Sequence, residues 1–138
     1  MEREGKVKPM PAGRDTFKQE HRFVPERNYY DCRLTGRITS IEPLIEAGRK
    51  LVKMAEATGC RRYLNDMRES VFDVPAEDIL RLVTAHSQGS VGQGWKRALL
   101  VEKMDPLLQL YDLATVNRNS DLKIFTDGEE ALRWLLAD

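Results

Sequence analysis

The stretch KRALLVEKMDPLLQLY, residues 96–111, decides the fold class of this chain. Its apolar run ALLV, residues 98–101, is continuous rather than alternating, which is typical of a strand buried on both faces of a parallel sheet. Asp105 and the proline after it predict a helix start, with the aspartate as N-cap and proline at the first helical position. The stretch therefore predicts a strand over 96–103 and a helix over 106–117.

Two further strand–helix units lie on either side of this one. After it, LKIFT, residues 122–126, predicts a strand, and Asp127 predicts the cap of a final helix. Before it, RRYLNDM, residues 61–67, predicts a strand that leads through a polar loop to a helix over about 75–87. Alternating strands and helices require crossover connections and a mainly parallel sheet.

A longer helix is predicted before these units. Apolar side chains recur at helical spacing from Ile41 to Ala55, over four turns. Thr39 with Glu42 predicts a capping box at the start of this helix. Gly59 predicts its end, because glycine readily takes the left-handed conformation of a C-cap.

Residues 16–24 and 29–35 alternate apolar and polar side chains on either side of the turn PERN, which predicts an antiparallel hairpin with one wet face. The element order is therefore β-β-α-β-α-β-α-β-α. We predict an α/β fold with an α+β-like edge: a single mixed, mostly parallel sheet with an N-terminal antiparallel hairpin and about four flanking helices. Residues 1–15 are predicted to form a tail outside a single domain over 16–138.

The C-terminal part of the chain resembles a known family. From Phe125 to Leu135 the sequence reads F-T-D-x-x-E-A-L-x-W-L, which is the most specific part of the resemblance. The segments RALLV, DPL and LNDMR, which begin at Arg97, Asp105 and Leu64, fit the same pattern. In these motifs the chain resembles the SpoIIAA-like, or STAS-like, domains of bacteria, with the likeness running in order along the predicted domain.

The resemblance implies a sheet flanked by helices and a regulatory interaction module, of which anti-sigma factor antagonists are the best-known examples. Such antagonists bind a kinase-type partner and are switched by phosphorylation of a serine in an Asp-Ser-Ser/Thr-Gly motif. In this chain the corresponding region, residues 65–73, reads NDMRESVFD and contains neither that motif nor a glycine. The switch serine of the family therefore does not carry over to Ser70.

The charge and cysteine content argue against several function classes. Lys+Arg and Asp+Glu each number 22, so the formal net charge is zero, and no bulk attraction to nucleic acid or an anionic membrane is expected.

Cys32 and Cys60 form no CxxC pair, and His21 and His86 are far apart in the sequence, so no metal site is predicted. With no signal-peptide core and no apolar run near the ~18 residues of a membrane span, we expect a cytoplasmic protein without integral membrane association.

The loops at the carboxyl ends of the parallel strands form the predicted binding site, because ligands gather there in open α/β sheets. Asp73 and Asp105 in these loops also read as simple helix caps, and Arg68 as an ion-pair partner of Asp66 or Glu69. The candidate ligand or partner edge consists of Asp66, Arg68, Ser70, Asp73, Lys103 and Asp105.

No catalytic set is predicted, because the GxSxG nucleophile elbow is absent and the acidic residues are spread over helix surfaces. The leading hypothesis is a non-enzymatic regulatory or protein-interaction module that needs no cofactor and binds another protein or a second copy of itself. A homodimer through helix 106–117 is one form of it, since Leu108, Leu113 and Val116 fall outside the main apolar face of that helix.

The alternative hypothesis is a small-ligand or lipid-binding carrier domain, since such carriers share this general architecture. It requires an apolar pocket with a few polar groups near residues 66–73. An enzyme ranks third because no constellation of residues meets the usual geometric checklist, and a nucleic-acid-binding protein ranks lower still.

Overall fold

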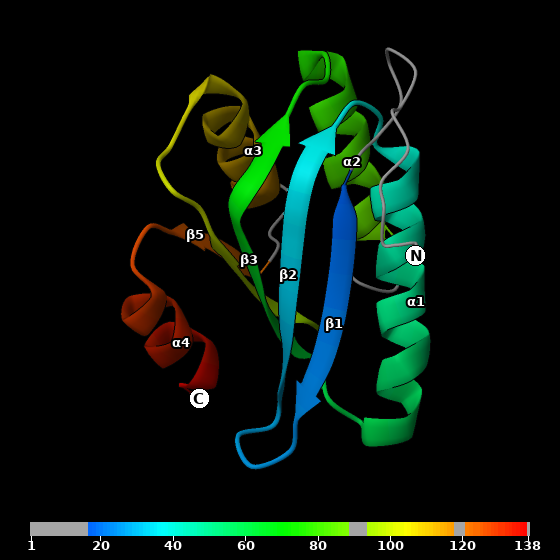
Figure 1. Ribbon diagram of the computed structural model, residues 1–138, viewed down its shortest axis with the longest axis vertical. Helices are drawn as coiled ribbons and strands as arrows, with labels where there is room; N and C mark the ends of the chain where they lie inside the picture. Colours follow the sequence, from blue (N-terminus) through cyan, green and yellow to red (C-terminus); the bar gives the residue numbers. More distant parts are fainter. Residues whose placement is uncertain (1–16, 89–93, 118–120, 138) are drawn as a thin grey trace, which may run out of the picture.

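Five strands form one sheet in the order β1-β2-β3-β4-β5 (Figure 1). This computed structural model describes residues 17–88, 94–117 and 121–137, without the side chains of 86–88 and 116–117; the predicted tail lies outside the described residues. The first two strands pair antiparallel and the others follow in parallel, so the predicted mixed sheet with an N-terminal hairpin is confirmed. The strands are β1 (Lys18–Val24), β2 (Tyr29–Ile38), β3 (Arg62–Phe72), β4 (Lys96–Leu100) and β5 (Leu122–Phe125).

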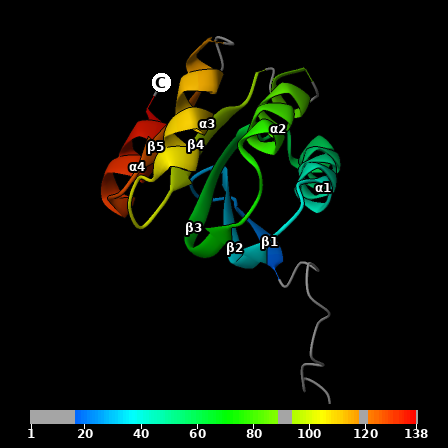
Figure 2. The same cartoon turned by 90° about the horizontal axis from the view of Figure 1, so that it is seen from above.

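Four helices flank the sheet, in two unequal layers. Because the strands follow chain order and parallel crossovers are right-handed, the three connecting helices must lie on the same face. The fourth helix follows the last strand and covers the other face, so α3 and α4 lie on opposite sides of β4 and β5 (Figure 2). The helices are α1 (Glu42–Thr58), α2 (Ala76–Gln88), α3 (Pro106–Asn117) and α4 (Gly128–Leu136).

The two layers correspond to two hydrophobic clusters. The larger cluster joins one face of β2, β3 and β4 to α1, α2 and α3. The smaller cluster joins the other face of the sheet to α4. In β4, Leu99 belongs to the larger cluster while Ala98 and Leu100 belong to the smaller one. The prediction that this strand is buried on both faces is therefore confirmed.

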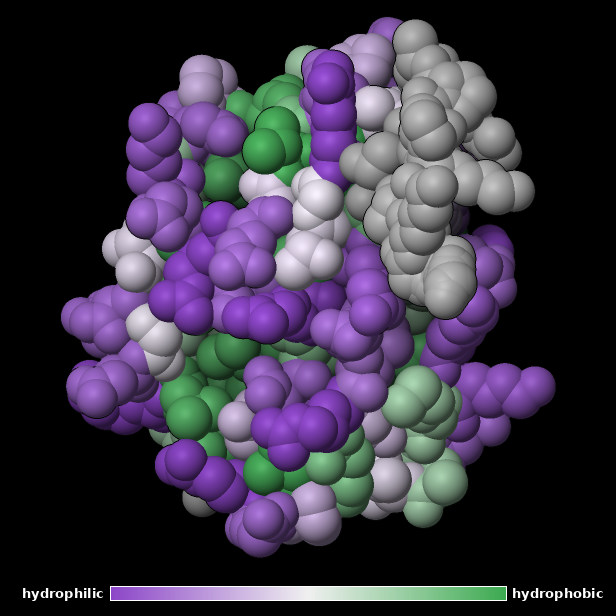
Figure 3. All heavy atoms as spheres, viewed as in Figure 1, coloured by the Kyte–Doolittle hydropathy of each residue, from purple (hydrophilic) through white to green (hydrophobic). Residues whose placement is uncertain are grey.

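The hairpin has the single wet face that its alternation predicts. Tyr30, Cys32 and Leu34 of β2 are buried against the larger cluster. Lys18 and Glu20 of β1 are exposed on the opposite face, where α4 does not reach. Hydrophilic side chains spread over this outer face of β1 and β2 (Figure 3).

Three local predictions of helix ends are confirmed. Gly59 ends α1 in the left-handed conformation, with φ 72°, and its N–H donates to the Ala55 carbonyl at 2.7 Å. The Asp127 side chain accepts hydrogen bonds from the N–H groups of Glu129 and Glu130 at the start of α4. Asp105 accepts from the Leu108 N–H at 2.9 Å, as an N-cap of α3 should.

The predicted capping box of α1 is wrong. The helix begins at Glu42, not after Thr39, and Ile41 stands at its N-cap without a side-chain hydrogen bond. Pro43, in the first turn, has a fixed φ suited to that position and has no N–H that needs a cap. Ile41 is fully buried, so the packing of this residue helps to fix the start of the helix.

Several strand boundaries also differ from the prediction, among them the end of β2, which continues to Ile38. β3 continues through the residues expected to form a polar loop and ends at Phe72, because its second half pairs with the end of β2. The pairing shifts between Arg33 and Thr35, where β3 has one more residue than β2, which is a β-bulge. β4 ends at Leu100, three residues earlier than predicted.

Candidate functional site

The structure places the predicted edge residues partly on a strand rather than in a loop. Asp66, Arg68 and Ser70 belong to β3, and the loop prediction for Arg68 and Ser70 is wrong because β2 supplies a pairing partner. Lys103 and Asp105 lie in the loop between β4 and α3, so Lys103 follows the strand rather than ending it. The negative charge of Glu102 in that loop acts on Arg68, so the two segments do share one edge of the sheet.

Asp66 and Arg68 bind each other through two parallel hydrogen bonds. Nε of Arg68 lies 2.9 Å from Oδ1 of Asp66, and Nη2 lies 2.8 Å from Oδ2. The Arg68 backbone N–H also donates to Oδ1, at 3.1 Å. These hydrogen bonds hold the pKa of Asp66 below its usual value despite partial burial. The predicted ion pair is thus present, and it occupies the guanidinium fork that would otherwise bind an external carboxylate or phosphate.

The other polar residues of the edge also have internal partners. The Ser70 hydroxyl donates to the Met67 carbonyl at 2.8 Å. Asp73 forms an ion pair with Arg37 of β2, and α2 begins only at Ala76, so the predicted cap role of Asp73 is wrong. Both side chains are therefore engaged within the chain at the end of β3.

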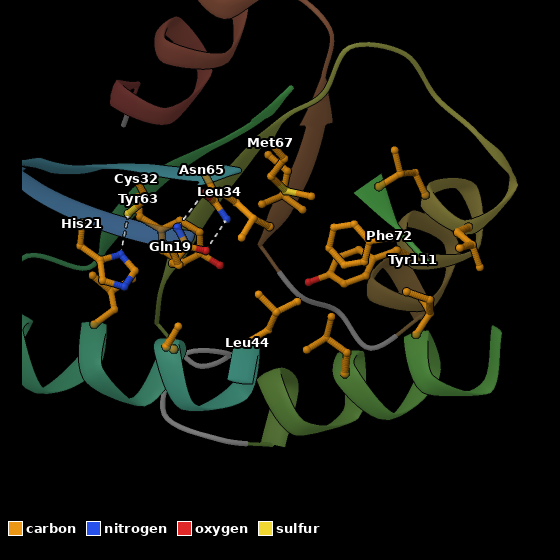
Figure 4. A pocket seen from close by; sticks show the side chains of 18 residues that line it. Gln19, His21, Cys32, Leu34, Leu44, Tyr63, Asn65, Met67, Phe72 and Tyr111 are labelled. Carbon is orange, nitrogen blue, oxygen red and sulfur yellow. Dashed lines mark hydrogen bonds between the residues drawn. The ribbon is translucent and has the colours of Figure 1, made fainter. Parts of the chain in front are cut away.

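A cavity lies between the sheet and the three helices of the larger layer (Figure 4). Its volume is about 70 Å³, several times the roughly 10–15 Å³ that one water needs. Met67 and Phe72 contribute to its wall, so it lies where the small-ligand hypothesis requires a pocket. Most of the other lining residues are apolar: Leu34, Leu44, Ala47, Gly48, Leu51, Ile79, Leu82, Leu99, Leu107 and Leu108.

A pair of amides forms the polar part of the cavity wall. Gln19 of β1 reaches across β2 to Asn65 of β3, and its Nε2 donates to the Asn65 Oδ1 at 3.2 Å. The same Nε2 lies 3.1 Å from the Arg33 carbonyl. The two amides lie next to each other on the sheet side of the cavity (Figure 4). The wall therefore combines a large apolar area with one group of neutral donors and acceptors.

A neutral imidazole and a protonated thiol stand beside this pair. His21 Nδ1 lies 3.2 Å from Sγ of Cys32. Burial lowers the pKa of His21, as does the charge of Lys50, while a hydrogen bond to the Ala47 backbone opposes the shift. Burial also raises the pKa of the Cys32 thiol. Both directions favour a thiol that donates to an uncharged ring, the reverse of the thiolate–imidazolium pair that a cysteine nucleophile needs.

A buried arginine stands behind the tyrosines of the cavity wall. Arg97 of β4 is only 1% exposed. Burial raises the pKa of Tyr63, and a hydrogen bond with Arg97 and its positive charge oppose that shift. Burial likewise raises the pKa of Tyr111, against the same charge. The two phenols therefore stay neutral and structural at ordinary pH.

This cavity was not predicted from the sequence. Its lining residues come from all of the first four strands and from α1, α2 and α3, so no motif contains them. One signal was available: Gly48 interrupts the apolar face of α1, where glycine costs about 1 kcal/mol relative to alanine. Leu108 was expected outside the main apolar face of α3, but it lines the cavity and packs against the core.

The described ranges contain neither a cluster of metal ligands nor a membrane-spanning helix. No group of three or more His, Cys, Asp or Glu side chains is placed to hold a metal ion among those residues. None of the described helices is both long enough and apolar enough to span a membrane.

No protein-family model matches this chain, and no curated protein matches it in sequence. Among solved structures, it is similar to an anti-sigma factor antagonist from Mycobacterium paratuberculosis, with a TM-score of 0.60 and 13% identity over 88% of this chain and 96% of that one. It is also similar to an uncharacterised protein of the DUF3478 family with a SpoIIAA-like fold from Shewanella loihica PV-4, with a TM-score of 0.53 and 22% identity over 92% of this chain and 99% of that one. The chain therefore has a SpoIIAA-like fold, as its motifs suggested.

Proposed function

We propose that this chain is a non-enzymatic regulatory module that binds a protein partner at the strand-end edge. We define the strand-end edge as the surface formed by residues 66–73 of β3 and its following loop, together with residues 101–105 after β4. The fold supports this proposal because a similar solved structure is an anti-sigma factor antagonist. Fold likeness is a weak warrant for function, so the features of the edge itself carry the proposal.

The observation that carries it is an open strand edge with an exposed apolar side chain. The last pair between β3 and β4 joins Asp66 to Leu100, yet β3 continues to Phe72 beside β2 alone. In the described sheet, one side of residues 67–72 therefore has no neighbouring strand. Val71 in this segment is 61% exposed. Open edges and exposed apolar groups of this kind are where other chains pair or pack.

The chemistry of the polar groups supports binding rather than catalysis. At the strand-end edge, Asp66 is ion-paired and its pKa is lowered, which leaves a weak base. The Ser70 hydroxyl donates to the Met67 backbone carbonyl rather than to a side-chain base. In the cavity, Cys32 is held as a neutral thiol. An ion-paired aspartate, a hydrogen-bonded serine and a neutral thiol are poor bases and nucleophiles, which supports a role in binding a partner rather than in catalysis.

Photo-cross-linking in the cells that make the protein tests this proposal. Benzoylphenylalanine placed at Val71 should give an adduct with one partner protein, identified by mass spectrometry. The matched control carries the same group at Glu129, which is exposed on α4 in the other layer, and should give none. The absence of an adduct at Val71, or the same adducts at both positions, would contradict the proposal.

A second copy of the chain is the alternative partner, through α3. Leu113 on this helix is 60% exposed. If the chain self-associates through α3, Leu113→Asp should shift a dimer to a monomer in sedimentation velocity. Unchanged sedimentation of Leu113→Asp, with partner binding also unchanged, would exclude α3 as the interface.

A further inference from the structure

We propose that the cavity between the sheet and α1, α2 and α3 is a binding site for a small uncharged molecule with an apolar body and one hydrogen-bonding group. This inference goes beyond the proposed function. The cavity lies between the sheet and three helices, and among its described lining residues only Met67 and Phe72 belong to the strand-end edge. One site can therefore exist without the other.

The size of the cavity limits the occupant. An apolar cavity of about 150 Å³ in an engineered protein stays dry and binds benzene or xenon. The cavity here has about half that volume, about 70 Å³, so by the same scale it holds roughly three non-hydrogen atoms. Because the cavity is not fully closed, the end of a short chain can extend beyond it. A short aliphatic alcohol or a similar neutral molecule has this size.

The lining excludes a charged occupant. None of the described residues that line the cavity is Asp, Glu, Lys or Arg. The one basic side chain, His21, faces the Cys32 thiol, and burial together with the charge of Lys50 lowers its pKa, against a hydrogen bond to the Ala47 backbone. A carboxylate, phosphate or amine would lose its hydration there without gaining an ion-pair partner, which costs several kcal/mol. An uncharged molecule avoids that penalty.

Asn65 supplies the hydrogen-bonding point. Its Oδ1 accepts one hydrogen bond from Gln19, and its Nδ2 donates to the Gln19 Oε1 at 3.5 Å, the outer limit of a hydrogen bond. A side-chain amide has two donor hydrogens and two acceptor lone pairs. Within the described residues, Asn65 thus keeps one donor and one acceptor, which match a single hydroxyl or carbonyl group of an occupant.

Small residues of α1 make the space. Ala47 and Gly48 both line the cavity in the middle of the helix, between Leu44 and Leu51. A larger side chain at either position would take up volume on this side of the sheet. The small residues of α1 therefore leave room for the cavity, although the glycine lowers the stability of the helix.

Methyl NMR titration of the full chain with xenon and with n-propanol tests the proposal. Binding of xenon depends on the apolar volume alone. Binding of n-propanol depends on that volume and also on the hydrogen bond to Asn65. We expect saturable shifts from both probes, confined to methyl groups of the lining residues. Shifts that do not saturate, or that spread evenly over the two layers, would overturn the proposal.

Two variants with a matched control make the test specific. Leu34→Phe fills the cavity and should weaken both probes at least tenfold, whereas Leu132→Phe, the same change in the α4 layer, should leave both unchanged. Asn65→Leu should weaken n-propanol about 2- to 10-fold through loss of a hydrogen bond, with xenon unaffected. This second variant keeps the test decisive if Leu34→Phe does not fold. Equal binding by Leu34→Phe and wild type, or unchanged n-propanol binding by Asn65→Leu, would refute the site.

Discussion

The two layers that flank the sheet differ in how closely they are packed. In the α4 layer, Ala98 of β4 and Ala131 and Leu135 of α4 are completely buried. In the layer formed by α1, α2 and α3, several leucines line a cavity of about 70 Å³ instead of filling the space. The two layers cover opposite faces of the same sheet, so both the helices and the strand side chains that face them contribute to the difference.

The ends of the helices explain part of this difference. α4 is held at both ends by side chains: Asp127 caps its start, and Lys96 Nζ donates to the carbonyls of Trp134 and Ala137, at 2.6 and 2.8 Å, at its end. α1 has no side-chain cap at Ile41 and presents Ala47 and Gly48 to the cavity. The α4 layer thus stabilises the fold, while the other layer gives up some packing and gains an internal site.

The largest difference between the two layers is expected when one leucine in each is truncated to alanine and the free energies of unfolding are compared. Leu135 is 0% exposed and Leu44 is 8% exposed, and both lie on helices. We expect Leu135→Ala to lower the free energy of unfolding by about 3–5 kcal/mol and Leu44→Ala by about 2 kcal/mol. The reason is that a side chain at a cavity already lacks neighbours on one side. Urea denaturation measures both, and equal losses would show that the layers are packed alike.

A smaller effect is expected from the cap of α4. Asp127→Ala removes the acceptor of two backbone N–H groups and should lower the free energy of unfolding by about 1 kcal/mol. Asp127→Asn retains a good N-cap and serves as the matched control. If the asparagine variant loses as much as the alanine variant, the carboxylate acts through charge on the helix dipole rather than through the hydrogen bonds.

The smallest expected effect is a pH dependence in the cavity layer. The pKa of His21 is lowered in the folded protein, mainly by burial, so the unfolded chain takes up a proton first as the pH falls. The stability contributed by a neutral His21 is therefore complete above about pH 6.5, the ordinary histidine pKa, and declines as the pH falls below it.

Comparison with His21→Gln isolates this contribution. Glutamine keeps polar atoms in place but does not titrate, so the stability of the variant should fall less than that of wild type between pH 7 and pH 5. Asp66 does not interfere with this measurement, because its pKa is lowered from an already acidic value. The stability contributed by its ionised form is lost only at a pH below the range in which histidine titrates. Parallel curves for the two proteins would contradict a buried neutral His21. Thermal or urea unfolding at each pH makes the measurement.

Features set by short-range chemistry were predictable from the sequence. The caps at Asp105 and Asp127 and the glycine end of α1 depend on residues within one helical turn, and all three predictions are confirmed. The pair of Asp66 and Arg68, two residues apart, was also expected and is present. In each case the interacting groups are close along the chain, so the pattern of residue types contains the information.

Features set by distant partners were not predictable in the same way. The second half of β3 reads as a polar loop, and it is a strand only because β2 runs beside it as far as Ile38. The start of α1 follows the burial of Ile41 rather than the capping box of Thr39 and Glu42. Local propensity was outweighed in both places by pairing or packing with residues far away in the sequence.

The amino-acid pattern alone was enough to predict the alternation of strands and helices, the mainly parallel sheet and the hairpin at its edge. It also revealed the resemblance to SpoIIAA-like domains. These depend on hydrophobic periodicity, turn residues and the handedness of crossovers, which are properties of the chain itself. The cavity, the amides of Gln19 and Asn65 that meet across β2, and the neutral pair of His21 and Cys32 were decided only when the layers packed. Volume, burial and hydrogen-bond partners arise between elements, and no single segment of the sequence carries them.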